Sequence, residues 1–242
     1  MIAFVNQAAG GSGGTSVNQN LAVTAGNLVV AVGSANSPGR TLSITDANIN
    51  WTQLSGSPWT DSANSCTTAI WIGTVINSGT DNIAISSNGS PTLTAMSVAQ
   101  YSGTANYLSA LDKMAKGDLG AITSGNPLLT GTTTTTSQPN EMLVACYGLL
   151  TAGNTFTQGA GYSLRGNTIG GGPPAIGAGI EDRSVSVTGA YQATITINGN
   201  TTGGTGVILA LQPPPEIFSA QESVSHYGSE GATSFGNVIG GG

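Results

Sequence analysis

One short apolar stretch occurs twice in the chain and constrains the fold more than any other feature. The first copy, residues 26–33, reads GNLVVAVG, and the second, residues 140–148, reads NEMLVACYG. Each copy begins with a turn-forming residue and ends with glycine, which is typical of a buried central strand in a sandwich or barrel. Two downstream turns repeat as well: Ser78-Gly79 and Asn88-Gly89 recur as Thr188-Gly189 and Asn198-Gly199, in both cases 110 residues later.

A further echo, Trp51-Thr52-Gln53 and Phe156-Thr157-Gln158, indicates a core role for both aromatic residues. The repeats divide residues 1–212 into a first half of about residues 15–102, a connector of residues 103–127 and a second half of about residues 128–212. About 10 to 12 strands over this length favour one all-β, jelly-roll-like β-sandwich built from two related halves. Two tandem immunoglobulin-like sandwiches are disfavoured, because neither half has the usual arrangement of core tryptophan and cysteines.

Three segments stand apart from the repeated strands. The connector has no counterpart in either half, and the spacing of Leu108, Leu111 and Met114 permits one short helix in it. Residues 159–174 read as a long loop that is absent from the first half and is able to carry contacts. The threonine run of residues 132–136 predicts a strand, because β-branched residues fit the pleat.

The last segment, residues 213–242, is expected to form an extended arm. Three prolines, Pro213 to Pro215, end the repeated region, since proline cannot join a central strand. The rest is rich in glycine and serine and cannot by itself bury enough surface to offset its ordering entropy. We therefore expect its sparse apolar residues to bind neighbouring subunits, and these assembly residues are Ile217, Phe218, Val224, Tyr227, Phe235, Val238 and Ile239.

Composition narrows the classes of protein that fit this chain. Charged residues make up only 7% of it, against roughly 25% in typical soluble domains, and 37 of its 242 residues are glycine. Small polar residues on strands suit a rigid β-structure made for surface contact. With a net charge of −6 and five scattered basic residues, direct nucleic-acid binding is not expected. No apolar run approaches the ~20 residues that span a bilayer, and the N-terminus does not read as a secretory signal peptide.

The sequence predicts no enzyme activity. A Ser-His-Asp triad needs a positioned histidine, and the single histidine, His226, lies in the arm. Glycosidase chemistry needs two facing carboxylates, whereas Glu181 and Asp182 are adjacent in a strand and point to opposite faces. Glu181 with Arg183 is instead expected as a surface pair. The carboxylates are all expected to be solvated, and they are Asp46, Asp61, Asp81, Glu141, Glu181 and Asp182.

No metal or cofactor site is expected either. Asp46, Asn48 and Asn50 alternate like calcium ligands, but the downstream glutamate and the glycine of an EF-hand loop are missing. Cys66 and Cys146 both lie in apolar, strand-like runs and read as buried free thiols.

Two aromatic residues are candidates for contact with a glycan. Trp59 lies in the loop GSPWTD, residues 56–61, and is the better exposed of the tryptophans by its context; Tyr162 lies in the loop of residues 159–174. The alternative for Trp59 is packing over the end of a sheet.

The order of the motifs resembles that of a known group of proteins. A Leu/Val core strand after a Gly-Asn turn is followed by Asp46, by Trp51-Thr52-Gln53, by Ala69-Ile70-Trp71 and by a hairpin that ends in residues 97–103, SVAQYSG. This pattern resembles β-sandwich domains of uncharacterised bacteriophage structural proteins and bacterial surface proteins, over about residues 15–212. The resemblance implies a virion or cell-surface module with no common enzymatic activity.

We therefore expect a non-enzymatic structural protein of a phage particle, assembled in the host cytoplasm. It would be a capsid decoration, head-fibre or tail-surface subunit, and its partners would be copies of itself and a major capsid or tail protein. One alternative is a carbohydrate-binding module that recognises a host surface glycan. Another is the subunit of an extracellular filament, in which the arm adds a strand to the next subunit; either alternative would place the protein outside the cell or on its surface.

Overall fold

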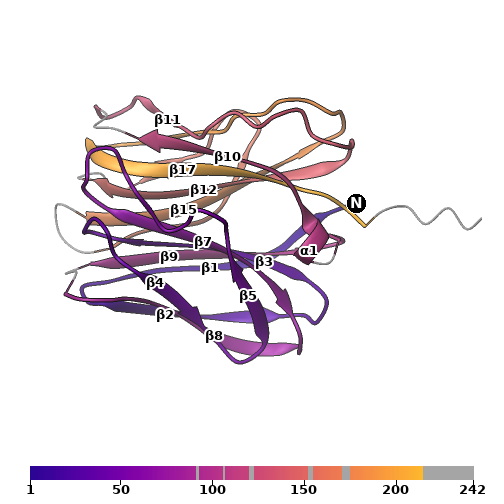
Figure 1. Cartoon of the computed structure of the whole chain (residues 1–242), viewed down its shortest axis with the longest axis horizontal. Coiled ribbons are helices and arrows are strands. Elements are labelled where there is room, and N and C mark those ends of the chain that lie inside the picture. Colours follow the sequence, from indigo (N-terminus) through magenta and orange to yellow (C-terminus); the bar gives the residue numbers. More distant parts are fainter. Residues whose placement is uncertain (91–92, 106, 120–122, 152–154, 171–174, 215–242) are drawn as a thin grey trace, which may run out of the picture.

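The computed structural model describes residues 1–90, 93–105, 107–119, 123–151, 155–170 and 175–214. These residues form antiparallel strands almost throughout, and the prediction of an all-β fold is confirmed (Figure 1). The helix that they contain, α1 (Tyr107–Ala110), is a single turn. The seven predicted assembly residues of the arm lie outside the described residues.

The two halves contribute comparable sets of strands. The strands of the first half are β1 (Ala3–Ser12), β2 (Ser16–Val23), β3 (Leu28–Ala35), β4 (Leu42–Thr45), β5 (Ile49–Gln53), β6 (Trp59–Thr60), β7 (Thr67–Val75), β8 (Gly79–Ser87) and β9 (Thr94–Ser102). Those of the second half are β10 (Leu111–Leu119), β11 (Pro127–Leu129), β12 (Glu141–Thr151), β13 (Phe156–Thr157), β14 (Ser163–Gly170), β15 (Ala175–Val185), β16 (Thr194–Ile197) and β17 (Thr201–Leu211).

The strands are divided among four sheets. Sheet A has the order β1-β9-β3-β7-β5, with β6 also paired to β7, and sheet B has the order β2-β8-β4. In the second half, sheet C has the order β10-β17-β12-β15-β14 and sheet D the order β11-β16-β13. The orders of A and C correspond strand for strand, as do those of B and D, so the two halves repeat one topology.

The connector carries a strand of this repeat. Strand β10 pairs with β17 as β1 pairs with β9, and both pairs have a bulge near their start, between Phe4 and Asn6 in β1 and between Leu111 and Lys113 in β10. The interpretation of residues 103–127 as an unrepeated connector is therefore wrong, and the helix that was expected there is limited to α1. Likewise, the expected loop of residues 159–174 contains β14, the counterpart of β5. A bulge and an edge position weaken the alternation by which a strand is recognised.

The four sheets are stacked in the order B, A, C, D (Figure 1). Sheet A packs on B through one core and on C through a second, and sheet C packs on D through a third. Each half thus forms its own double sheet, where one double sheet was expected for the whole chain. The central strands of A and C are covered on both faces, which explains why all eight residues of β3 are buried and why its sequence is a continuous apolar run.

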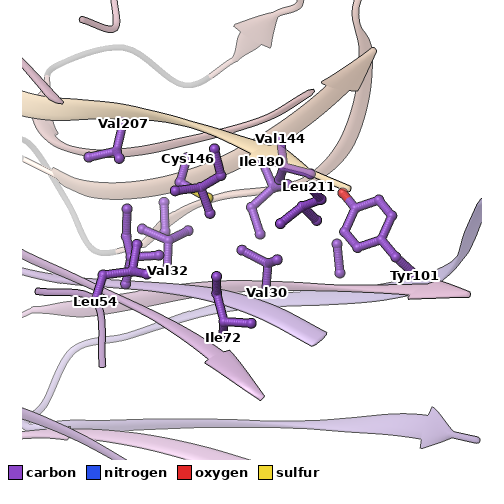
Figure 2. Packing of buried hydrophobic residues seen from close by; sticks show 14 of the residues in the cluster. Val30, Val32, Leu54, Ile72, Tyr101, Val144, Cys146, Ile180, Val207 and Leu211 are labelled. Atoms are coloured by element: carbon purple, nitrogen blue, oxygen red, sulfur yellow. The ribbon is translucent and has the colours of Figure 1, made fainter. Parts of the chain in front are cut away.

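The central core joins the two halves. Figure 2 shows Val30, Val32 and Ile72 of sheet A facing Val144 and Cys146 of sheet C. The strand registers make Val30 equivalent to Val144 and Val32 to Cys146, so both halves use the same face of the large sheet. Each fully buried aliphatic side chain contributes about 1.5–3 kcal/mol by leaving water. Cys66 and Cys146 are buried free thiols in this core, as predicted.

The echo between Trp51 and Phe156 does not mark equivalent positions. Trp51 lies in β5 of sheet A and packs against the A–B core, whereas Phe156 lies in β13 of sheet D and is buried in the C–D core. Their core roles are confirmed. Each ring covers a glycine of a large sheet: Trp51 covers its cross-strand partner Gly73 within sheet A, and Phe156 of sheet D covers Gly179 of sheet C. The same kind of space is thus filled from different strands.

The threonine run is held by paired hydrogen bonds, although it is not a regular strand. Counting from Thr130, just before the run, every third residue is a buried threonine. Its N–H donates to a carbonyl of residues 189–193, and its hydroxyl accepts from the N–H of the same partner. The pairs are Thr130 with Ala193, Thr133 with Tyr191, and Thr136 with Gly189. Three residues of the run thus match two of the partner, as in a repeated bulge.

Close backbone contact between the halves should make one glycine critical. A Cβ on Gly11 of β1 would lie 2.6 Å from Cα of Gly170 in β14, whereas a Cβ on Gly13 would meet no heavy atom of the described residues within 4 Å. We expect Gly11→Ala to lower the free energy of unfolding by about 1–3 kcal/mol, because backbone must move to admit the methyl group. Denaturant titration measures this change, and Gly13→Ala is the control. Equal stability of the two variants would contradict the close backbone contact between β1 and β14.

The threonine pairing should be equally open to test. Thr130→Val keeps the shape of the side chain but leaves the N–H of the fully buried Ala193 without its acceptor, 2.9 Å away. We expect a loss of about 1–3 kcal/mol in unfolding free energy, the typical cost of an unsatisfied buried donor. Thr134→Val, at an exposed position of the same run, should change stability little in the same measurement.

Candidate functional site

Carboxylates form the chemically distinctive part of the interior. Asp61, Asp81, Glu141, Glu181 and Asp182 are each at most 3% exposed. The prediction that they are solvated is therefore wrong. A buried carboxylate is removed from water, so each needs a hydrogen-bond donor or a proton.

Glu181 is enclosed in the core between sheets C and D. The Tyr147 hydroxyl donates to its Oε1 at 3.0 Å, and the Gly159 N–H donates to its Oε2 at 2.8 Å. Burial raises the pKa of Glu181 to about 7, although the two donors oppose the rise. No ion pair joins it to Arg183 among the described residues, so the expected surface pair is not formed. These contacts make Glu181 a bridge from β15 to the chain that follows β13.

Asp182 lies on the opposite face of sheet C, as the sequence predicts. Its Oδ2 accepts a hydrogen bond from Nε of Arg165 at 2.8 Å, and the Arg165 guanidinium lies 4.1 Å from the ring centroid of Phe4 in the first half. The Phe4 ring meets Tyr101 edge to face at 6.1 Å. Burial raises the pKa of Asp182, and Arg165 opposes this. The group therefore links the two halves through charge and aromatic contacts.

This arrangement does not supply the carboxylate pair of a glycosidase. Glu181 and Asp182 are separated by the sheet, so they cannot flank one bond of a substrate. Glu141 lies at the start of β12, buried beside Asp112 of β10, and Asp112 in turn is bound by Lys113 and Ser137.

Two carboxylates, Asp46 within the loop of residues 46–50 and Asp81 of β8, bind the backbone of this loop. Asp46 Oδ1 accepts from the N–H groups of Asn48 and Ile49, its Oδ2 accepts from the Trp51 indole, and Asp81 accepts from the N–H groups of Ala47 and Asn48. Burial raises the pKa of Asp46, and hydrogen bonds from Trp51 and the backbone oppose this. A cation would have to displace these donors. The described residues contain no group of three or more His, Cys, Asp or Glu side chains placed to hold a metal.

The two predicted glycan contacts lie in different cores. Trp59 is half-buried, belongs to β6 beside β7, and packs against the central core. Tyr162 is 7% exposed and packs in the core between sheets C and D, where burial and then the nearby Glu181 raise the pKa of its hydroxyl. The structure does not bring the two rings together on one surface, and only Trp59 keeps a partly accessible side chain.

One pocket, of about 420 Å³ including open solvent, lies where the N-terminus meets the ends of β12 and β15. It is lined by Met1, Ile2, Asn140, Glu141, Ser184, Val185 and Ser186. Met142 of β12 faces the central core and Leu143 faces the C–D core. Strand alternation therefore places the Glu141 carboxylate on the side of Leu143, and neither of its oxygens is exposed.

The outer face of sheet B offers a flat, uncharged surface. Its outward side chains are Ser16, Asn18, Asn20, Ala22, Ser43, Thr45, Thr80, Asn82, Ala84 and Ser86. They bind one another across the strands: Asn82 donates to Asn20 at 2.8 Å and accepts from Asn18 at 3.4 Å, and the hydroxyls of Ser86 and Ser16 are 3.1 Å apart. Such a face is suited to contact with another neutral polar surface.

Comparisons of the chain with protein-family models, with curated proteins and with solved structures gave no match. In the part of the chain that the structure describes, no helix has the length and apolar character needed to cross a membrane.

Stability should fall as the pH rises through the titration range of Glu181. Its pKa is raised from 4.5 to about 7, so the folded state keeps a proton that the unfolded chain loses above pH 4.5. We expect this group to lower the free energy of unfolding by up to about 3 kcal/mol between pH 4.5 and 7.5. Glu181→Gln should remove that part of the slope in thermal unfolding across this range. Asp118→Asn, at an exposed carboxylate, should leave the slope unchanged.

Proposed function

We propose that this protein is a non-enzymatic structural subunit of a phage particle, exposed on the capsid, a head fibre or the tail surface. The observation that carries the proposal is the double-layered repeat itself. Two matching double sheets share an apolar central core, which makes a stiff body whose outermost layers, B and D, face away from each other.

The use of charge in this body supports the same function. The charged side chains inside it join strands and halves, as Glu181 and Asp182 do. The outer face of sheet B carries only Ser, Thr, Asn and Ala. A neutral, hydrogen-bonding face packs against neighbouring subunits without the cost of desolvating charges.

The partners in this proposal are copies of the protein and a major capsid or tail protein, and the place of assembly is the host cytoplasm. The sequence of residues 216–242, with apolar residues scattered in a glycine- and serine-rich background, supplies the assembly contacts. Segments of this kind gain order on binding across symmetric interfaces.

A carbohydrate-binding role is the second candidate, and the partly accessible ring of Trp59 favours it. A half-buried tryptophan can stack on a sugar while its other face packs on protein. Saturable binding on a glycan array that is lost in Trp59→Ala and retained in Tyr162→Phe would place recognition ahead of assembly.

Deletion of residues 216–242 tests the assembly proposal. We expect the truncated protein to unfold at the same temperature as the full chain, because a glycine- and serine-rich segment with scattered apolar residues buries too little surface to stabilise the fold by itself. Its incorporation into particles, measured by co-sedimentation with assembled capsids or tails, should fall below detection. A full-length Phe218→Ser/Phe235→Ser variant separates loss of apolar contacts from loss of chain length. Normal incorporation of the truncated protein would contradict the proposal.

A further inference from the structure

Asp112 fastens two segments that lie far apart in the sequence. It is the extra residue in the bulge of β10, between Leu111 and Lys113. Its Oδ1 lies 2.9 Å from Nζ of Lys113, and its Oδ2 accepts from the N–H of Ser137 at 2.6 Å; Lys113 also donates to the Ser137 hydroxyl at 2.8 Å. Burial alone would raise the pKa of Asp112, but the donors Ser137 and Lys113 bring it to about 2. Asp112 is therefore ionised and holds the chain before β12 against β10.

Glu141 lies beside this ionised group, where the two side chains can share a hydrogen bond once one of them holds a proton. Its side chain is buried, 1% exposed, and among the described residues neither carboxylate oxygen accepts a hydrogen bond of normal geometry. Burial and then the charge of Asp112 raise the pKa of Glu141 to about 7; Lys113 is the other charged group that acts on it, and the backbone near Gln138 acts in the opposite direction to burial. A proton on Glu141 makes it a donor toward Asp112. Loss of that proton leaves two neighbouring carboxylates charged, with Lys113 paired to Asp112.

The pair lies beside the place where the chain leaves sheet C. Gln138, three residues before Glu141, donates from Nε2 to Oε1 of Gln212 at 3.2 Å. Gln212 donates from Nε2 to the Ser109 carbonyl at 2.5 Å and from its backbone N–H to the Ala110 carbonyl at 2.8 Å. We name residues 211–214 the C-terminal root. Its hydrogen bonds run directly to the segment that Asp112 and Glu141 hold.

We propose that the Asp112–Glu141 pair is a proton-operated latch on the C-terminal root, closed while Glu141 keeps its proton and loosened when the proton is lost. Loss of the proton weakens the contact between β10 and residues 137–141. The Gln138–Gln212 hydrogen bond weakens with it, so the root opens to solvent more often. The latch acts on the described fold and does not depend on what residues 215–242 bind.

Hydrogen exchange of the full-length protein tests the latch. The opening equilibrium should rise between the pKa of 4.5 in the opened state and that of about 7 in the closed state, and it should level off above pH 7. After correction for intrinsic exchange rates, we expect the protection of the Ser137 and Gln212 amides to fall by at least about tenfold between about pH 5 and about pH 7.5. A change of less than about twofold in the unmodified protein would overturn the proposal.

Glu141→Gln gives the decisive comparison. The amide of glutamine donates to Asp112 at every pH, so protection of the root should be the same at both values. Glu181→Gln removes a second buried glutamate of sheet C that is remote from the root, and it should leave the pH dependence of Gln212 intact. A Glu141→Gln variant with the pH dependence of the unmodified protein would refute the latch.

A titration of the unmodified protein covers the case in which Glu141→Gln does not fold. Carbon-13 NMR of the Glu141 carboxyl carbon should show a midpoint near pH 7 that coincides with the loss of Gln212 protection. A midpoint near 4.5 would refute the latch without any substitution.

Discussion

The packing of sheet A on sheet C is the contact on which the rest of the structure depends. It buries equivalent faces of the two halves, in which Val30 is equivalent to Val144 and Val32 is equivalent to Cys146. Because sheets B and D cover the other faces, the central strands β3 and β12 have no solvated side. The low content of charged residues, 7% of the chain, is compatible with this arrangement, because few charged side chains have to be excluded from the three cores. The repeat therefore behaves like two subunits of a symmetric dimer joined by one chain.

Buried charge is used sparingly and for attachment. Asp182, Arg165 and Phe4 link the second half to the first, and Glu181 links β15 to the chain after β13. Glu141 differs from these, because among the described residues its oxygens accept no hydrogen bond of normal geometry, and its own proton serves as the donor toward Asp112. That difference connects the stability of the fold to pH at one end of sheet C. In the proposed function, the residues that follow the C-terminal root carry the assembly contacts. The proposed latch of Asp112 and Glu141 would then act on the segment that leads to those contacts.

The proposed function rests on surfaces more than on a pocket. The pocket at the N-terminus is lined mainly by small polar and apolar side chains, and neither oxygen of its one carboxylate, Glu141, is exposed. The outer face of sheet B, by contrast, presents hydroxyl and amide groups on neighbouring strands in register. Stiffness from the shared core and neutrality at the outer layer are properties of a building unit, and they are also compatible with recognition of a neutral glycan through Trp59.

The sequence by itself determined the all-β class, the repeat at a spacing of 110 residues, the buried thiols and the opposite orientation of Glu181 and Asp182, because alternation and turn chemistry are local. Only the tertiary structure decided that four sheets are stacked, that β10 completes the second half and that the carboxylates are buried. A strand covered on one face and a strand covered on both differ in what packs over them, which a local pattern does not record. The donors to Asp112 and Glu181 illustrate this: Ser137 and Gly159 reach them through backbone N–H groups, which every residue except proline possesses and no sequence pattern marks.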